Sequence, residues 1–587
     1  MSLSDEDYEL LAQDIPSLDD PFIRQFVSGS EALQSKESAL RFDAPFRASL
    51  SPIARRAAAI VSRIREHENK TVWSPTAAAG EADSDKGDSK DRAVHPGMPF
   101  HLDRPLIETT DLWRIVRKLP KGAALHSHLD GLADFDYVIG LLLETPGIHI
   151  SAHGPLSSPA LLVSGHVRFR LRFRKKETSG ASIWASDYVP GTWEALSRAA
   201  DEFPDEGRAG FMRWLKAQCV ISPHEAVQDR HHGPGAIWRS FERCFQIADS
   251  ILHYEPIFRA FLRRLMSHLR DGGVSWIEIR ITYALDFYRQ GSETPEEDYH
   301  YLYSVIDEEL TRFKSDPANS SFWGLRVIWT SPRALQTRDL IQDMDNCITT
   351  KLAFPHLIAG YDVCGQEDRG RPLRDLLPEL FWFRKQCAQE GVDIPFFFHA
   401  GETLDSGPGM ANTNLYDALL LGTRRLGHAF SLYRHPLLID MVKEKRVLVE
   451  LCPVGSNEML RLSGPVATHP LPALLARGVP AALGNDCPGM LGQGRSSTSH
   501  DFWQALQGWG DLGLEGLGAL AENSVRWAAF EDETAAEWTA RVREASLGEG
   551  VKAQRLKEWA TEWEKFCLWV VMEFGEEYGD EPGPARR

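Results

Sequence analysis

The chain has 587 residues, 43% of them hydrophobic, which is enough for one large domain with additions or for two to three ordinary domains. Its formal net charge of −18 argues against nucleic acid and anionic membranes as main partners, and leaves small neutral ligands open. The eight cysteines include no Cys-x-x-Cys pair and the first residues lack a signal-peptide pattern, which together predict reduced thiols and a cytoplasmic protein.

The two ends of the chain differ in pattern from its middle. Residues 1–74 have a helical pattern with a basic amphipathic stretch, which predicts a surface helix packed by its apolar face or, alternatively, a dimerisation arm. Residues 75–95 are rich in Ala, Gly, Ser, Asp and Lys without an apolar period, which indicates a disordered linker. We expect a main domain at 96–545 and a C-terminal helix with an acidic tail at 546–587.

Short β-like runs recur through the main domain, mostly with helical patterns between them. Strands that alternate with helices predict a parallel sheet, and eight such units predict an α/β fold, a (β/α)8 barrel of the TIM type. The runs are 123–126, 274–280, 325–330, 357–362, 395–399, 425–428, 447–452 and 479–485.

An unusually long segment separates the first two runs. It exceeds the usual crossover between strands, so we expect an inserted subdomain at about 145–235. Its clearest element alternates apolar residues, Val167, Phe169, Leu171 and Phe173, with arginines. We interpret it as a half-buried strand with a solvated basic face. A nucleic-acid strip is the alternative, but stacking aromatic side chains would then be needed on the basic face.

Polar side chains recur at or just past the carboxyl ends of these runs. In a barrel those ends converge on one mouth, where active sites lie. A single such residue is commonly a buried histidine bonded to a carbonyl or a carboxylate that caps the next helix. Agreement among so many strand ends favours a shared site made by His126, His128, Glu278, Asp362, His399, Glu402, His428 and Asp486.

The types of these side chains point to metal-assisted hydrolysis. His126 and His128 occupy alternate positions, so both imidazoles face the same side of an extended segment. With His399 and Asp486 they make a set that suits Zn²⁺, although Fe²⁺ and Mn²⁺ remain open. Such an ion lowers the pKa of a bound water. Glu402, which the turn at Gly401 brings back to the cavity, and His428 are then free to transfer protons.

Four segments, in this order and spacing, resemble the signature segments of the adenosine/AMP deaminase family of metal-dependent hydrolases. They are 125–131 (Leu-His-Ser-His-Leu-Asp-Gly), 398–403 (Phe-His-Ala-Gly-Glu-Thr), 425–428 (Arg-Leu-Gly-His) and 485–488 (Asn-Asp-Cys-Pro). The chain is most similar to the adenosine deaminase-related growth factor branch, also called adenosine deaminase 2-like. That similarity rests on the long N-terminal region, the insertion after the first segment, and residues 236–241, 276–280 and 358–368.

The resemblance implies hydrolysis of adenosine to inosine and ammonia in a TIM barrel with one zinc ion per chain. It also implies a homodimer formed through the N-terminal helices. Members of that branch are typically secreted, which contrasts with the missing signal-peptide pattern of this chain. The zinc ligands implied by the resemblance are His126, His128, His399 and Asp486.

The resemblance also implies roles around the substrate. Glu402 would exchange a proton with purine N1, and His428 would position and deprotonate the water. Gly365 would offer its backbone N–H to purine N3, and Asp130 would bind the 5′-hydroxyl of the ribose.

One position departs from the family pattern. Cys487 stands where the family usually has an aspartate that hydrogen-bonds purine N7, and a thiol is a much weaker partner. This leaves two alternatives to adenosine deamination. The protein could act on a different or N6-substituted purine, or be a growth-factor-like binding protein without catalysis. The presence of an acid, a base and four metal ligands argues against the second alternative.

Overall fold

The computed structural model describes residues 4–73, 100–172, 180–227, 234–283, 286–403, 413–459, 466, 469–494 and 497–579. The expected linker at 75–95 and the expected acidic tail after residue 579 lie outside these ranges. Within the described ranges, no helix combines the length and the apolar character needed to cross a bilayer.

The main domain is built on two four-stranded parallel sheets that join edge to edge. The first has the order β1 (Gly122–His128), β5 (Val274–Thr282), β6 (Gly324–Pro332), β7 (Ile358–Cys364). The second has the order β11 (Ala481–Leu483), β10 (Leu448–Leu451), β9 (Arg425–His428), β8 (His399–Ala400). Parallel bridges between Tyr361 and Phe396 and between Ser127 and Asp486 close the ring. The predicted (β/α)8 barrel is thus confirmed.

The fifth barrel strand differs most from its expected range, 395–399. The regular ladder is confined to β8 because Pro395 has no N–H to donate, and Phe396 pairs only by an isolated bridge. Backbone bonds from Tyr361 to Pro395 and from Phe397 to Tyr361 nevertheless hold the segment in the barrel wall. The aromatic run is buried, so the strand is positioned by packing as well as by its ladder.

Helices cover the outside of the barrel, which explains why its strands are buried on both faces. Those between the strands and after the last strand are α13 (Glu255–Asp271), α14 (His300–Ser315), α15 (Thr337–Ala353), α16 (Leu377–Glu390), α17 (Asn414–Leu420), α18 (Pro436–Lys445), α19 (Pro453–Met459), α20 (Leu471–Ala476), α21 (Ser497–Gly508) and α22 (Gly513–Arg526). α5 (Phe100–Ile107) and α6 (Asp111–Lys118) precede β1, while α23 (Ala535–Glu544) and α24 (Gly550–Tyr578) end the described chain.

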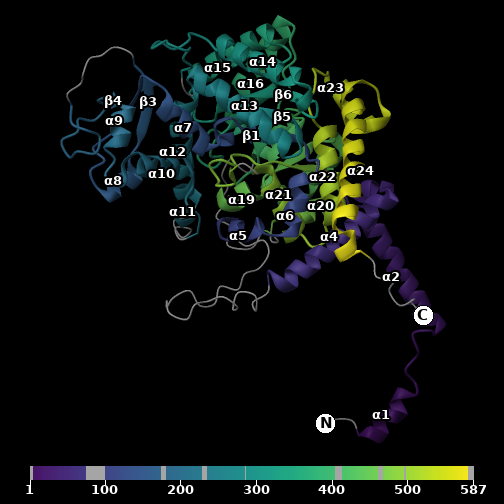
Figure 1. The fold of residues 1–587 in the computed structure, drawn as a ribbon. Coiled ribbons are helices and arrows are strands. Elements are labelled where there is room, and N and C mark those ends of the chain that lie inside the picture. Colours follow the sequence, from purple (N-terminus) through teal and green to yellow (C-terminus); the bar gives the residue numbers. More distant parts are fainter. Residues whose placement is uncertain are drawn as a thin grey trace, which may run out of the picture.

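The segment between β1 and α13 forms a lobe beside the barrel (Figure 1). Its antiparallel sheet has the order β3 (Val167–Leu171), β2 (Ile148–Ala152), β4 (Glu194–Ala195). The helices of this segment are α7 (Phe135–Glu144), α8 (Pro159–Ser164), α9 (Leu196–Asp201), α10 (Gly207–Cys219), α11 (Pro223–Val227) and α12 (Pro234–Leu252). Along β3 the apolar residues are buried and the arginines exposed, as expected from their alternation; Phe173 lies outside the described residues.

The N-terminal region is helical, with α1 (Asp5–Ala12), α2 (Pro21–Ala39), α3 (Ala44–Ser49) and α4 (Pro52–Thr71). The apolar side of α4, including Ile60, Val61 and Ile64, is buried, and the helix packs on α24. In contrast, α1 and α2 project away from the rest of the molecule (Figure 1) and bury no residue. The region therefore has an anchored part and a projecting part.

Candidate active site

A cavity of about 530 Å³ lies at the carboxyl ends of the barrel strands, a volume typical of small-molecule sites. Six of the side chains expected at the site line it together: His128, Asp130, His399, Glu402, His428 and Asp486. His126 lies directly behind them, fully buried, with its ring 4.5 Å from that of His428. The strands thus bring residues from distant parts of the chain to one mouth.

The four expected metal ligands converge. His128 Nε2 lies 3.4 Å from His399 Nε2 and 3.5 Å from Asp486 Oδ1. His126 Nε2 lies 3.9 Å from the same oxygen, and it is buried without a hydrogen-bond partner. One ligand atom from each of the three histidines lies within 4.8 Å of the others. An orphaned imidazole nitrogen in a cluster of this size fits a single Zn²⁺, whose bonds to nitrogen and oxygen are about 2.0–2.2 Å long.

Backbone geometry holds the ligands in place. Asp486 follows β11 in the left-handed region, with φ of 54°, and its N–H donates to the carbonyl of His126 at 3.1 Å. His128 donates its N–H to the Asp486 carbonyl at 3.0 Å. His428 at the end of β9 also has a positive φ, 62°. Such conformations are costly for residues other than glycine and concentrate at functional sites.

Two buried carboxylates orient the histidines from behind. Glu450 Oε2 lies 2.8 Å from His126 Nδ1, and Asp362 Oδ2 lies 2.6 Å from His399 Nδ1. Arg280 donates to both carboxylates, at 2.8 and 2.7 Å. This arrangement favours protons on Nδ1 and leaves each Nε2 lone pair directed into the cluster, the second-layer pattern seen at metal sites. Sequence reasoning did not assign roles to Glu450 and Arg280, although a carboxylate inside the apolar run 447–452 was a usable signal.

Burial and charge keep the imidazoles of His126 and His128 neutral. Burial lowers the pKa of His126 and of His128 well below the usual value, and the charge of Arg280 lowers both further. For Asp362, burial alone would raise the pKa, but His399 and Arg280 hold it well below its usual range. Neutral imidazoles at His126 and His128 beside the ionised Asp362 are protonation states that suit the binding of a divalent cation.

The expected acid and base face each other at the cavity. Glu402 Oε1 lies 3.5 Å from His428 Nε2. Burial, reinforced by the charges of Asp486 and Glu367, raises the pKa of Glu402 well above its usual value. Burial and the neighbouring His399 lower the pKa of His428, whose Nδ1 has no hydrogen-bond partner. The pair therefore consists of a protonated carboxylic acid and a neutral imidazole.

The expected substrate-binding residues divide into two groups. Asp130 lines the cavity with a buried, unpartnered Oδ1, and burial together with Asp249 raises its pKa to about 7. Gly365, with φ of 107°, lines the cavity just after β7. Cys487 does not line it, because its thiol is buried against Gly131: a Cβ on that glycine would lie 2.6 Å from Sγ. The thiol also lies 3.6 Å from Oδ1 of Asp486, which does line the cavity, so the expected contact of Cys487 with substrate stays a prediction.

One buried carboxylate and one aromatic wall differ from what the sequence alone predicted. Glu278 is not at the mouth as expected: it lies buried inside the barrel and accepts from Trp276 Nε1, from the Ala529 N–H and from Arg425. The apolar wall of the cavity comes instead from α12, which contributes Trp238, Phe241 and Phe245. A motif search centred on polar residues gives no role to such a wall.

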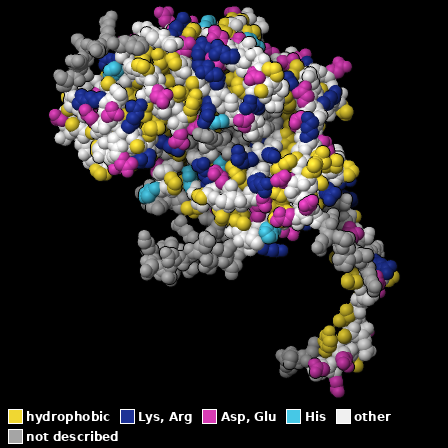
Figure 2. Space-filling view, viewed as in Figure 1, with side chains coloured by type: hydrophobic (Ala, Val, Ile, Leu, Met, Phe, Trp, Pro, Cys, Tyr) yellow, Lys and Arg dark blue, Asp and Glu magenta, His cyan; other side chains and the backbone are white. Residues whose placement is uncertain are grey.

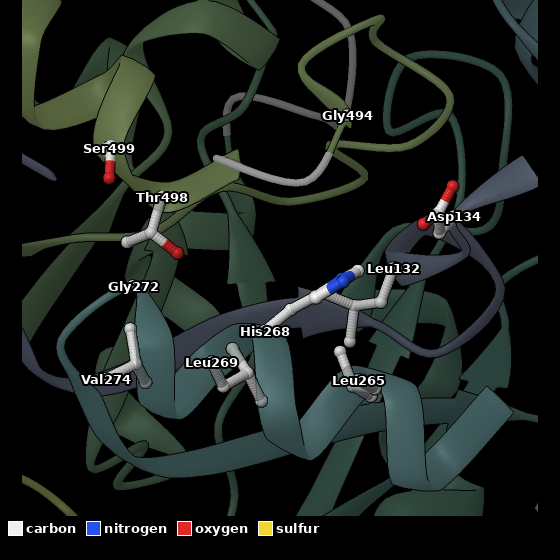
Figure 3. Close-up of a pocket in the computed structure, with 10 residues that line it drawn as sticks. All are labelled: Leu132, Asp134, Leu265, His268, Leu269, Gly272, Val274, Gly494, Thr498 and Ser499. Atoms are coloured by element: carbon white, nitrogen blue, oxygen red, sulfur yellow. The ribbon is translucent and has the colours of Figure 1, made fainter. Parts of the chain in front are cut away.

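Other hollows do not match this site. The recess in Figure 3, between α13 and the start of α21, holds only about 30 Å³, room for water but not for a nucleoside. Another cavity, of about 540 Å³, lies under β3. It adjoins the active-site cavity at Gln246 and Asp249. Asp130, Asp249 and His253 cluster near that junction, where His253 Nε2 lies 2.8 Å from Asp249 Oδ1.

Comparison with known proteins identifies the family. The family model described as adenosine deaminase matches residues 223–545, more than half of the chain. The chain belongs to the adenosine deaminase family. It is accordingly a hydrolase of the deaminase type, and the resemblance inferred from the four segments is confirmed. The match covers His399, Glu402, His428 and Asp486, whereas His126 and His128 precede it and join the same site through the fold.

Relatives of this deaminase cover most of its length. Adenosine deaminase 2 of Homo sapiens is 28% identical over 481 residues, 81% of this chain and 84% of that protein. Adenosine deaminase of Lutzomyia longipalpis is 29% identical over 465 residues, 78% of this chain and 80% of that protein.

Solved structures also match. An amidohydrolase from Burkhoderia ambifaria with bound Zn is 16% identical, with 78% of this chain and 94% of that chain covered and a TM-score of 0.48. The arabidopsis ADAL protein complexed with IMP is 16% identical, with 77% and 99% covered and a TM-score of 0.47.

Proposed function

We propose that this protein catalyses the zinc-dependent hydrolytic deamination of a 6-aminopurine nucleoside, converting adenosine and water to inosine and ammonia. One observation carries the proposal: a cluster of three histidines and an aspartate shares a cavity with a buried carboxylic acid and a neutral imidazole. A protein that only binds a ligand needs no such combination.

The metal and the protein would divide the chemistry. His126, His128, His399 and Asp486 would hold Zn²⁺, which lowers the pKa of a water toward neutrality. His428 would take a proton from the attacking water, because it is neutral and has an unpartnered nitrogen.

Glu402 would supply the acid. Because burial keeps it protonated, it can donate a proton to purine N1 and make C6 more electrophilic. Attack of water at C6 and protonation of the amino group then allow ammonia to leave.

The rest of the cavity supports a nucleoside as the substrate. The aromatic wall of α12 fits a flat base, and Gly365 would offer its N–H to purine N3. Asp130 would bind the 5′-hydroxyl. With Asp249 nearby, a 5′-phosphate would meet two carboxyl groups, so nucleosides should be preferred over nucleotides. Since no carboxylate from position 487 faces the base, an N6-substituted or different purine is the second candidate.

The test is hydrolysis by the zinc-loaded protein of adenosine, 2′-deoxyadenosine and AMP, measured as ammonia release, and of N6-methyladenosine, measured as methylamine release. We expect about one zinc per chain and the highest kcat/KM with a nucleoside. Glu402→Gln should keep the zinc and lose about 100- to 10,000-fold in kcat, because an amide cannot transfer the proton. A higher kcat/KM with AMP would indicate a nucleotide deaminase. Full zinc occupancy without deamination of any purine would favour the binding-protein alternative.

A further inference from the structure

Glu367 is a buried carboxylate that belongs to none of the roles described above. It follows β7 and is only 2% exposed. Its Oε1 accepts from the Gly401 N–H and from Asn414 Nδ2, both at 2.8 Å. Its Oε2 accepts from the Thr403 N–H at 3.1 Å and from the Thr403 hydroxyl at 3.4 Å. Both oxygens of Glu367 therefore act as hydrogen-bond acceptors.

These contacts flank Glu402. The N–H groups of the residue before it and of the residue after it both point at the same carboxylate. The carbonyl of Gly401 is held as well, because it accepts from the Ser431 N–H at 2.8 Å. Gly401 itself has φ of 74°, and a Cβ there would lie 2.9 Å from the side chain of Leu415. The turn that directs Glu402 into the cavity is therefore fixed from three sides.

Glu367 differs from the other buried carboxylates of the barrel. Asp362, Glu450 and Glu278 each accept from an arginine. For Glu367, no ion pair with an arginine or lysine occurs in the part of the chain that the structure describes. The buried carboxyl group of Glu367 is stabilised instead by hydrogen bonds from this turn and from Asn414. A buried charge without a cationic partner lowers the stability of the fold. This loss of stability is explained if the charge of Glu367 acts on the neighbouring acid, Glu402.

We propose that Glu367 is a positioning residue for the proposed deamination: it holds the turn 401–403 so that the carboxyl group of Glu402 meets the purine at the distance and angle needed for proton transfer. This inference rests on the proposed function. It is supported electrostatically, because the charge of Glu367, after burial and Asp486, contributes to the raised pKa of Glu402. Glu367 does not line the cavity and touches no substrate itself.

The test is Glu367→Gln in the full-length, zinc-loaded protein. The amide keeps the volume but offers a donor where one of the N–H groups needs an acceptor, so the turn should relax. A displacement of about 1 Å at a reacting group can cost about 100-fold in rate. We expect kcat for adenosine to fall by about 10- to 100-fold, while KM stays within about threefold and the zinc content is unchanged.

A matched control is Thr403→Val, which removes only the long hydroxyl contact and keeps the backbone N–H. It should leave kcat within about threefold of the wild type. Glu367→Asp is a second variant that keeps the charge but cannot span both N–H groups, so it should show the same selective loss in kcat.

A double-mutant cycle separates positioning from general damage. If Glu367 acts through Glu402, then adding Glu367→Gln to Glu402→Gln should lower kcat little further, whereas independent structural damage should multiply the two losses. Multiplying losses, or a kcat unchanged in both Glu367→Gln and Glu367→Asp, would overturn the positioning role. If the wild type deaminates no purine, the proposed function fails instead.

Discussion

At the residue scale, the protonation states of the site follow from burial combined with a few fixed charges. Arg280 lies at the centre of this pattern, because it donates hydrogen bonds to Asp362 and Glu450 and contributes to the lowered pKa values of Asp362, His126 and His128. Burial raises the pKa of Glu402, which accepts no hydrogen bond from an arginine among the described residues, so this group is kept protonated. One low-dielectric cavity thus contains metal-binding bases and a proton donor.

The carboxylate behind His126 should control metal affinity. We expect Glu450→Gln to weaken Zn²⁺ binding by about 10- to 100-fold, because the amide no longer fixes the Nδ1 proton and the basicity of Nε2 falls. Competition with a chelator of known affinity measures this. Glu278→Gln is the matched control: it changes a carboxylate in the same arginine network that contacts no histidine. Equal zinc affinity in the two variants would contradict the orienting role of Glu450.

The position of the buried Cys487 thiol predicts how strongly the protein prefers a purine with N7 over its 7-deaza analogue. An acidic partner at N7 would be worth about 1.5–3 kcal/mol, or roughly one to two decades in kcat/KM. Because Cys487 packs against Gly131 instead, we expect adenosine and 7-deazaadenosine to differ by less than about tenfold in kcat/KM. Cys487→Ser should not change that ratio. A preference for adenosine above about 100-fold would mean that another donor reaches N7.

At the scale of elements, the amino-terminal end of β1 is tied to two helices by one lysine. Lys121 is buried, and its Nζ donates to the carbonyls of Val116, Leu119 and Gly272 at 2.7, 3.3 and 2.8 Å. These carbonyls lie at the ends of α6 and α13, where helices have no internal donors. The contact therefore fixes the start of the strand whose other end carries His126 and His128.

Removing that link should destabilise the barrel without touching the chemistry. Lys121→Met removes the donor to the Leu119 and Gly272 carbonyls, at a cost of about 1–3 kcal/mol for each unsatisfied group, whereas the Val116 carbonyl still accepts from the Leu119 N–H. We expect a lower midpoint of thermal and urea unfolding, with kcat of the folded zinc form close to that of the wild type. Lys118→Met, an exposed lysine at the end of the same helix, serves as the control. Equal unfolding midpoints for the two variants would exclude the proposed role of Lys121.

At the scale of the whole molecule, the projecting N-terminal arm, defined as α1 and α2, stands out. It exposes apolar side chains along its length (Figure 2), including Leu10, Phe22 and Phe26, which are 73%, 75% and 73% exposed. The chain after it is anchored, since Phe42 donates its N–H to the Leu475 carbonyl at 3.0 Å. Apolar surface on an element that buries none of its own residues is expected to be covered by a partner.

We expect that partner to be a second copy of the chain. The full-length protein should then be a homodimer in analytical ultracentrifugation, and deletion of residues 1–40 should give a monomer with kcat close to that of the wild type. The site is built entirely from residues after the arm, which is why catalysis should survive. A full-length protein that sediments as a monomer at micromolar concentration would contradict this expectation.

The sequence by itself determined the barrel strands and most of the residues at their ends. Strand positions follow from local apolar runs, and His126, His128, His399, Glu402, His428 and Asp486 could be read from residue chemistry at those ends. The family match agrees with the family that the four segments indicated. Both conclusions depend on short-range patterns, which are visible along the chain.

Only the tertiary structure decided how those residues are supported. Glu450 meets His126 across 324 positions of sequence and Arg280 across 170, distances over which no local pattern reports a contact. The sequence also did not show where the Cys487 thiol packs or that Glu367 bonds to both neighbours of Glu402. Each contact depends on which backbone segments meet after the barrel closes. Local periodicity specifies elements, whereas the partners of buried charges are set by long-range packing.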